Sequence, residues 1–250
     1  MGAQLMISTL PPDGSPDTLL SIEHVSKRYH SLKRDAVSVL EGVSFTLQAG
    51  ESMALTGPSG SGKSTLTQLI AGTEPLSSGV IYWRGRALPP VSDPNRSAWR
   101  LKEVGLVFQD FRLFPHLTAL ENAALPLELL GRPAAKAEER ARALLDKVQL
   151  SQRLQHLPSE LSGGEQQRVA IARALAHNPS IVIADEPTGN LDWRSARRIA
   201  DLLFELSAQQ GVALFVVTHD LSLAERADKH LRLHQGQLQS APSLEDQHEQ

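Results

Sequence analysis

The sequence of 250 residues predicts an α/β fold, in which helices cover both faces of a largely parallel sheet. Short apolar runs alternate with segments of helical periodicity, as expected of successive strand–helix units. The clearest runs are Ser52–Thr56, Ile181–Ala184 and Val212–Val217. Residues 112–177 interrupt this alternation, because they carry helical patterns and few strand signals. We therefore expect a sheet-containing lobe that is interrupted by a helical one.

The composition is that of an ordinary globular chain, and it argues against several classes of function. Hydrophobic residues make up 41% of the sequence, and the net charge of −3 gives no sign of a broad nucleic-acid-binding surface. The lack of cysteine excludes disulfides and thiolate metal sites. No apolar run approaches the roughly 18 residues that a membrane-spanning helix needs. We expect no nucleic-acid partner, and membrane contact only through another protein.

Strand patterns dominate the first third of the chain. Residues 1–18 contain prolines but no Lys or Arg, and they predict a flexible leader rather than a secretory signal. Apolar residues over 20–25 and 39–47 predict strands of an antiparallel subdomain at the edge of the sheet. The strand Ser52–Thr56 leads into a glycine-rich loop, and the helix after that loop is expected to stop at Gly72.

Two signatures of helix starts lie in the helical segment. Thr118 and Ser162 are each followed three residues later by a glutamate, which is the pattern of a capping box. Between them, residues 134–150 are rich in residues that favour helices.

Strand signals return in the last third of the chain. A helix is expected over residues 195–209, between two strands, and a final hairpin is expected to turn at Gly236. Residues 240–250 are polar and acidic and predict a flexible tail.

The loop after the strand Ser52–Thr56 carries a phosphate-binding motif, the P-loop. Its residues are Gly57, Pro58, Ser59, Gly60, Ser61, Gly62, Lys63, Ser64 and Thr65. The glycines let backbone amides converge on phosphates, and the helix that starts near Lys63 adds its positive dipole end. In this motif the lysine reaches the β- and γ-phosphates, and the serine hydroxyl, here Ser64, binds Mg²⁺. The sequence therefore predicts a P-loop NTPase that binds a nucleotide together with Mg²⁺.

Two carboxylates, Asp185 and Glu186, end the apolar strand Ile181–Ala184. An acid at this position in a P-loop protein binds Mg²⁺, which is the role we expect for Asp185. Glu186 is then the candidate general base that polarises the attacking water. Neighbouring residues on a strand point to opposite sides, but the chain turns here, so both carboxylates can face the nucleotide.

A second anion-binding pattern, the signature loop, consists of Ser162, Gly163 and Gly164 at a capped helix start. Leu161 precedes it, and Glu165-Gln166-Gln167-Arg168 follows it. Ser162 lies 99 residues after Lys63. This ordered set, with the two carboxylates and His219 further on, resembles the ATP-binding cassette ATPases that power membrane transporters. The resemblance covers roughly residues 19 to 238.

The resemblance implies how these motifs work together. Two copies are implied to face head to tail as a homodimer, so that Ser162, Gly163 and Gly164 of one copy close on the γ-phosphate held by the other. Asp192 is implied to contact the opposite P-loop region. Trp193, the next residue, has no assigned role in the family, and packing at the contact between the two copies is the simple alternative.

Further nucleotide contacts follow from the resemblance. Gln109 is implied to contact Mg²⁺ and the attacking water, and His219 to hydrogen-bond the γ-phosphate. Tyr29 is implied to stack on adenine, although taken alone it would be assigned to the core. The expected catalytic residues are therefore Lys63, Gln109, Glu186 and His219.

Details of the sequence narrow the resemblance to one branch. Residues 108–122 and the Gly189-Asn190 pair are similar to those of the lipoprotein-releasing and macrolide-exporting ATPases, and residues 219–239 are closest to YbbA-type members. The resemblance implies a catalytic lobe of residues 19–111 and 178–239 with an inserted helical subdomain at 112–177.

The implied partner is a separate integral-membrane permease, which docks on the helical subdomain, especially residues 110–130. The ATPase would lie at the cytoplasmic face of the bacterial inner membrane and drive export or extraction of lipoprotein-like or hydrophobic substrates. Two alternatives stay open: a regulator of a membrane protein, as in cell division, and the subunit of a small-solute importer, which Gly189-Asn190 disfavours. The single P-loop argues against a translation-type cassette, and 99 residues to the signature loop leave no room for the coiled coils of a repair-type one.

Overall fold

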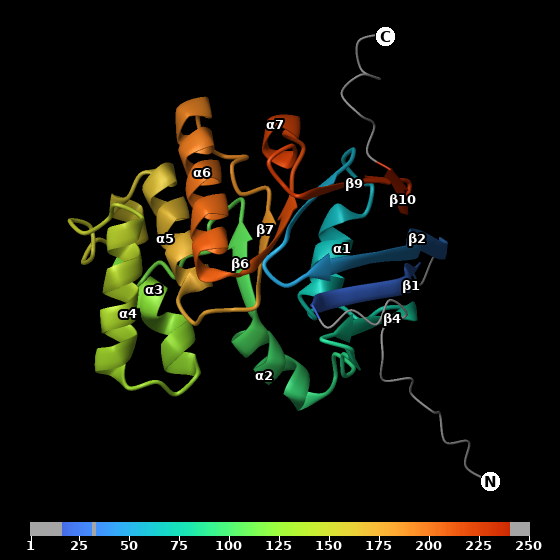
Figure 1. The fold of residues 1–250 in the computed structure, drawn as a ribbon, viewed down its shortest axis with the longest axis horizontal. Coiled ribbons are helices and arrows are strands. Elements are labelled where there is room, and N and C mark those ends of the chain that lie inside the picture. The colour runs from blue at the N-terminus through green and yellow to red at the C-terminus, as the bar shows by residue number, and fades with distance from the viewer. Residues whose placement is uncertain (1–16, 32–33, 241–250) are drawn as a thin grey trace.

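The computed structural model describes residues 17–31 and 34–240, and these residues are built on two sheets (Figure 1). The larger sheet has the strand order β10 (Gln237–Ser240), β9 (Lys229–His234), β3 (Ser52–Thr56), β8 (Ala213–Val217), β7 (Ile181–Asp185) and β6 (Val104–Phe108). The smaller, antiparallel sheet has the order β2 (Arg34–Gln48), β1 (Thr18–Ser31), β4 (Ser78–Trp83) and β5 (Arg86–Ala87). The expected α/β fold with an antiparallel subdomain is confirmed. The expected leader, except Asp17 and Thr18, and the expected tail, except Ser240, lie outside the described residues.

Five strands of the larger sheet, β3, β6, β7, β8 and β9, run parallel, so their carboxyl ends share one edge. Helix α1 (Lys63–Ile70) follows β3, and α6 (Trp193–Gln210) connects β7 to β8. The short helix α7 (Leu221–Ala224) follows β8. All three helices therefore begin at the edge where these strands end, which is where open α/β sheets bind ligands. We call it the carboxyl edge.

Four further helices lie between β5 and β7, namely α2 (Pro94–Glu103), α3 (Ala119–Leu129), α4 (Ala134–Lys147) and α5 (Gly163–Leu175), with a 3₁₀ turn at Pro158–Glu160. The capping boxes predicted at Thr118 and Ser162 are present at the starts of α3 and α5. Helix α4 ends three residues before the expected Leu150. In the part of the chain that the structure describes, no helix is long and apolar enough to cross a membrane.

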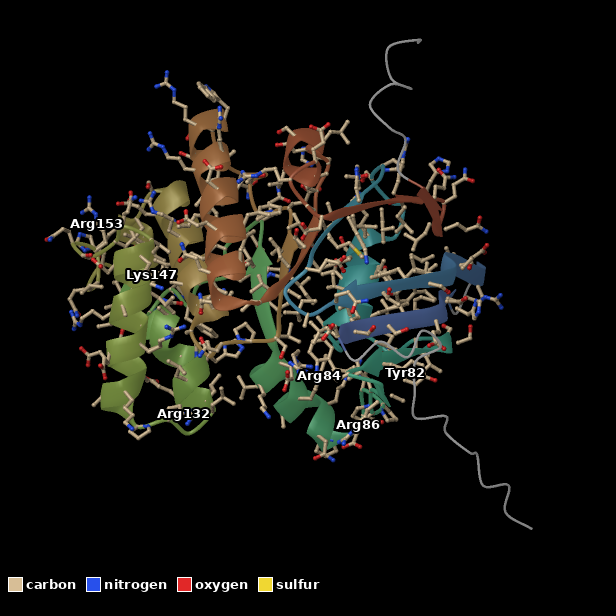
Figure 2. All side chains as sticks on the ribbon, in the orientation of Figure 1. Tyr82, Arg84, Arg86, Arg132, Lys147 and Arg153 are labelled. Atoms are coloured by element: carbon tan, nitrogen blue, oxygen red, sulfur yellow. The ribbon has the colours of Figure 1, made fainter. Side chains whose placement is uncertain are left out.

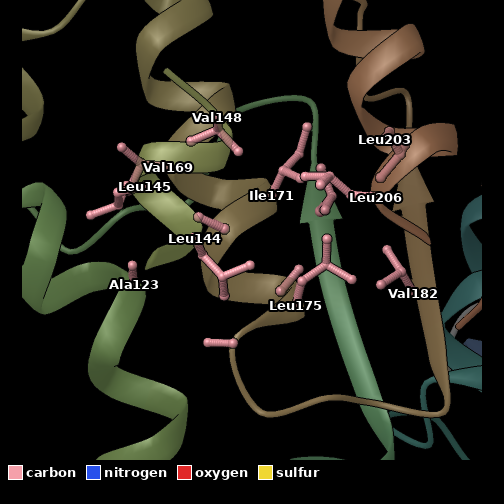
Figure 3. Packing of buried hydrophobic residues seen from close by; sticks show 14 of the residues in the cluster. Ala123, Leu144, Leu145, Val148, Val169, Ile171, Leu175, Val182, Leu203 and Leu206 are labelled. Atoms are coloured by element: carbon pink, nitrogen blue, oxygen red, sulfur yellow. The ribbon is translucent and has the colours of Figure 1, made fainter. Parts of the chain in front are cut away.

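The larger sheet separates two hydrophobic cores. Val182 and Val216 pack with α3–α6 on one face, whereas Ile183 and Phe215 pack with α1 and the smaller sheet on the other. The alternation arises because successive side chains of a strand point to opposite faces. Figure 3 shows the side chains of α4, α5 and α6 gathered on the first of these faces. The helical segment thus shares a core with the sheet, and its boundaries at 112 and 177 as a separate subdomain stay a prediction.

Candidate active site

The P-loop lies between β3 and α1 and lines a cavity of about 570 Å³ at the carboxyl edge. The P-loop residues that line it are Gly57, Pro58, Ser59, Gly60, Gly62, Lys63, Ser64 and Thr65. Asp185, Glu186 and His219 line the same cavity, together with Val39 of β2. Ser61 does not line it and is buried instead. The structure thus brings together residues from four distant segments of the chain.

Two glycines of the P-loop are required by close backbone contacts. A Cβ on Gly57 would lie 2.1 Å from the carbonyl oxygen of Leu233, and one on Gly62 would lie 2.8 Å from that of Val39. Both residues also have a positive φ, of 152° and 105°, respectively, which favours glycine. No side chain caps α1, so the first amides of this helix can bind an anion.

The ammonium group of Lys63 lies against the P-loop. Its Nζ donates hydrogen bonds to the carbonyl oxygens of Gly57, at 2.7 Å, and Pro58, at 3.0 Å. The lysine thereby brings a positive charge to the wall of the same cavity that the amides of α1 face. The cavity combines amide donors with an ammonium group, which suits a polyphosphate.

Asp185 ends β7 with its side chain partly buried. Burial raises the pKa of Asp185, and the nearby Glu186 raises it further, while Lys63 and Arg112 act in the opposite direction. A carboxylate with this surplus of negative charge is stabilised by a divalent cation. The hydroxyl of Ser64 and the carboxylate of Asp185 are hard oxygen donors of the kind that Mg²⁺ prefers, and both line the cavity. The residues present therefore fit Mg²⁺.

Glu186 adopts a backbone conformation that is rare for a residue with a side chain. Its φ is 48°, and its amide donates to the carbonyl oxygen of Val217 at 2.8 Å. The turn keeps Glu186 in the same cavity as its neighbour Asp185. Its Oε2 accepts a hydrogen bond from Nδ1 of His219 at 2.9 Å. This contact orients the candidate base.

Other predicted site residues do not line the P-loop cavity: Tyr29, Gln109, Ser162, Gly163, Gly164 and Asp192. The side-chain amide of Gln109 donates to Oδ1 of Asn190 at 3.0 Å, and the side chain of Asn190 returns a bond to the Gln109 carbonyl. The ring of Tyr29 is 40% exposed, with the ammonium of Lys27 4.7 Å from its centroid.

The signature loop is held by its own capping box. Oε2 of Glu165 accepts hydrogen bonds from the amide of Ser162, at 2.8 Å, and from its hydroxyl, at 2.7 Å. These bonds lower the pKa of Glu165, and Arg153, whose Nε lies 3.0 Å from Oε1, adds to the effect. Figure 2 shows Arg153 on the helical side of the molecule, far from Tyr82 of β4 and from Arg84 in the turn after it.

The loop before α6 lies beside the signature loop. A Cβ on Gly163 would lie 3.5 Å from Leu191, and one on Gly164 would lie 3.6 Å from Ser195. Asp192 caps α6, because its Oδ1 accepts hydrogen bonds from the amides of Arg194 and Ser195, at 3.1 Å each. The structure thus places the signature loop and Asp192 together, outside the P-loop cavity of their own chain.

Val39 and Arg112 are contacts that the sequence analysis did not predict. Val39 has the apolar pattern of a core strand, and only the packing of β2 on the P-loop brings it to Gly62. The guanidinium of Arg112 lies 3.9 Å from the ring centroid of Phe108 and lowers the pKa of Asp185. Neither role has a local signal, because each depends on contacts between segments far apart in the sequence.

A second cavity, the basic groove, has a volume of about 470 Å³ and lies between α2, β6 and α3. Its lining includes apolar residues and Arg100, Arg112, Arg173 and His177. Burial lowers the pKa of Arg173 to about 10, and its guanidinium donates to the carbonyl oxygens of Phe111 and Arg112. Phe114 and Leu129, which are 53% and 63% exposed, also line the groove.

Comparisons with known proteins agree with this geometry. The sequence model of the family described as ABC transporter matches residues 40–189. The ABC transporter ATP-binding protein YbbA of Escherichia coli strain K12 is 47% identical over 223 residues, which cover 89% of this chain and 97% of that protein. The lipoprotein-releasing system ATP-binding protein LolD of Idiomarina loihiensis is 45% identical over 213 residues, which cover 85% and 93%, respectively.

A solved structure extends the likeness to three dimensions. The ATP-binding cassette MJ0796, in a dimeric post-hydrolysis state bound to ADP and Pi, is similar with a TM-score of 0.81 and 35% sequence identity. The match covers 90% of this chain and 100% of that one. Since the family model and these relatives match over most of its length, the chain belongs to the ABC transporter ATPases, in the group of the YbbA and LolD ATP-binding proteins.

Proposed function

We propose that two copies of this ABC ATPase bind ATP and Mg²⁺ head to tail, and that hydrolysis drives a separate membrane permease. The observation that carries the proposal is the separation of two anion-binding helix starts. The signature loop begins α5 with a capped, glycine-rich turn, yet it does not line the P-loop cavity of its own chain. A second copy can supply it to that cavity, and the dimeric state of MJ0796 supports this arrangement.

Each residue has a proposed part in hydrolysis. Lys63 and the first amides of α1 bind the β- and γ-phosphates, and Tyr29 stacks on the adenine. Ser64, Asp185 and Gln109 hold Mg²⁺, which supplies charge neutralisation on the phosphates when it is bound.

Glu186 accepts a proton from the attacking water, and its bond to Nδ1 of His219 keeps the carboxylate in place. The other ring nitrogen of His219 hydrogen-bonds the γ-phosphate, and the side chain is 73% exposed. Ser162 and the following glycines close on the γ-phosphate of the partner subunit, and Asp192 contacts the P-loop region of the partner subunit. The chain thus supplies positioning, charge and a base, which phosphoryl transfer to water requires.

The basic groove is the proposed docking site of the permease. Its exposed apolar residues, Phe114 and Leu129, fit the apolar face of a short helix, and its arginines favour a helix that also carries carboxylates. Arg112 belongs both to the groove and to the surroundings of Asp185. A partner that binds in the groove and moves Arg112 can therefore change the electrostatic surroundings of Asp185.

The names of the LolD relatives support a task in the lipoprotein-releasing branch. We propose export or extraction of lipoprotein-like or hydrophobic substrates, with the ATPase peripheral to the cytoplasmic face of the bacterial inner membrane.

Co-purification with the membrane protein encoded by the adjacent gene tests this function. We expect the complex to hydrolyse ATP faster than the isolated ATPase. Leu129→Glu in the groove should abolish this stimulation but keep basal hydrolysis, whereas the matched variant Leu129→Met should behave like the native chain. If Leu129→Glu were still stimulated, the groove would not be the docking site. If no membrane protein co-purified, the result would favour a non-transport role over a permease-driving function.

A further inference from the structure

Trp193, the first residue of α6, is unusually exposed. Its exposed fraction of 71% exceeds that of every other large hydrophobic side chain in residues 17–31 and 34–240 whose burial the structure describes. A tryptophan offers 150–250 Å² for burial, on the order of several times the area of a small side chain, and such residues are typical anchors of protein interfaces. The guanidinium of Arg194 lies 5.2 Å from the ring centroid and leaves most of the ring in solvent.

The first two turns of α6 also carry an excess of positive charge, because the N-cap carboxylate of Asp192 stands against three arginines. Arg194, Arg197 and Arg198 are exposed, and none of them forms an ion pair with any residue that the structure describes. No acidic residue lies in the first turn. Positive side chains at a helix N-terminus face the positive end of its dipole, which is unfavourable within one chain. We call Trp193 and these three arginines the α6 patch.

The α6 patch continues the surface that the head-to-tail dimer would use. It follows Asp192 directly, and Ser195, between its members, lies next to Gly164 of the signature loop. Figure 1 shows α6 alongside α5, and both helices pack on the opposite face of the larger sheet from α1. The patch therefore lies beside the residues proposed to reach the nucleotide of the partner subunit.

The P-loop half of the carboxyl edge, by which we mean the P-loop cavity and α7, carries several carboxylates beside the ammonium group of Lys63. Asp220 caps the start of α7, Glu225 lies at its other end, and Glu186 lines the P-loop cavity, where bound ATP adds further negative charge. Leu221, the first residue of α7, is 41% exposed and offers an apolar surface next to these acids. In a two-fold dimer, the α6 patch of each copy faces the P-loop half of the other copy. The arginines then meet the carboxylates, and Trp193 meets Leu221, once in each of the two equivalent contacts.

From this complementarity we infer that a second copy of the chain covers the α6 patch when ATP closes the dimer. Trp193 packs on α7 of the partner subunit, against Leu221 of the partner subunit, and the arginines face the acidic half of that copy. The inference rests on the proposed head-to-tail dimer. It adds an anchor outside the ATP-contacting motifs, which sets how tightly the two copies close.

Acrylamide quenching of tryptophan fluorescence tests the inference in the Glu186→Gln chain, in which hydrolysis is slowed. The other two tryptophans, Trp83 and Trp99, are buried or half-buried and pack edge to face at 5.2 Å, so quenching reports mainly on Trp193. We expect ATP with Mg²⁺ to protect this fluorescence at concentrations where sedimentation shows a dimer. Adding Trp193→Ser should weaken dimerisation by roughly tenfold or more. Leu76→Ser, which removes an exposed apolar side chain between the far end of α1 and β4, is the matched control and should leave dimerisation unchanged.

The outcomes separate the two proposals. If the Glu186→Gln chain did not dimerise with ATP, the head-to-tail dimer would be wrong, and this inference with it. If that chain dimerised while Trp193 stayed as accessible to acrylamide as in the monomer, the dimer would stand and the α6 patch would not be part of it. The quenching result needs no change at Trp193, so it decides the matter even if Trp193→Ser failed to fold.

Discussion

Adjacent carboxylates at the end of β7 have different surroundings, and this difference underlies their proposed roles. Asp185 is partly buried, which raises its pKa, whereas Glu186 is held by the hydrogen bond from His219. The sequence pattern predicts that the two carboxylates belong to one site, and the family resemblance adds His219. It does not predict the left-handed backbone of Glu186, with its φ of 48°, because that conformation depends on the bond of its amide to β8.

The residue-scale prediction concerns the base. Glu186→Gln should keep ATP binding, because the P-loop amides and Lys63 are unchanged, while turnover falls by about 10²–10⁴-fold. Phosphate release and equilibrium nucleotide binding measure the two effects. Glu128→Gln, at an exposed carboxylate of α3, is the control and should hydrolyse ATP at the native rate. Near-normal hydrolysis by Glu186→Gln would exclude Glu186 as the base.

At the scale of elements, the sequence predicts the features that depend on residues close together in the chain better than those that depend on distant ones. The starts of α3 and α5 were predicted, because a capping box is complete within four residues. Helix α2 was not predicted, although the side chain of Asp93 caps its start and Pro94 is its first residue. The basic groove beside α2 could not be predicted either, since it forms where α2, β6 and α3 meet.

The capping box of α3 provides a test of stability without a change at the nucleotide site. Thr118→Ala should lower the free energy of unfolding by about 1 kcal/mol, because the amide of Glu121 loses the Thr118 hydroxyl as its acceptor. Thr118→Ser should restore most of the loss. Chemical denaturation measures both variants, and ATP affinity should stay native. Unchanged unfolding of Thr118→Ala would show that this cap does not stabilise α3.

The same cap should depend on pH. Hydrogen bonds from the amide and hydroxyl of Thr118 lower the pKa of Glu121 below its ordinary value of 4.5. A lowered folded-state pKa gives stability that is present above the unfolded value and is lost as pH falls through the folded value. The difference in unfolding free energy between native and Thr118→Ala chains should therefore be full at neutral pH and shrink below about 4.5. A difference that stayed constant down to pH 3 would contradict the role of the Glu121 carboxylate.

At the scale of the whole molecule, one chain contains all the motifs of hydrolysis but does not bring them into one cavity. The P-loop, Asp185, Glu186 and His219 line the cavity, and the signature loop lies apart with Asp192. Local patterns predict the P-loop, the two carboxylates and the signature loop, and the family resemblance adds His219 and Asp192. Their separation depends on the packing of α5 and α6 against the sheet, which no local pattern reports.

This separation makes a complementation prediction possible. Ser162→Arg should abolish hydrolysis and keep the ATP affinity of the monomer, because Ser162 does not line the P-loop cavity of its own chain. Mixing this variant with Glu186→Gln should restore activity that neither shows alone. One site of the mixed dimer then combines the Glu186 of one chain with the Ser162 of the other. A mixture no more active than the sum of its parts would argue against shared sites.

The most direct test is the structure of the Glu186→Gln chain with ATP and Mg²⁺ bound. We expect two nucleotides between two copies, with the Ser162 hydroxyl of each copy within hydrogen-bonding distance of the γ-phosphate held by the other P-loop. A structure in which a single chain encloses each triphosphate, with no signature loop of a second copy beside it, would contradict the composite site.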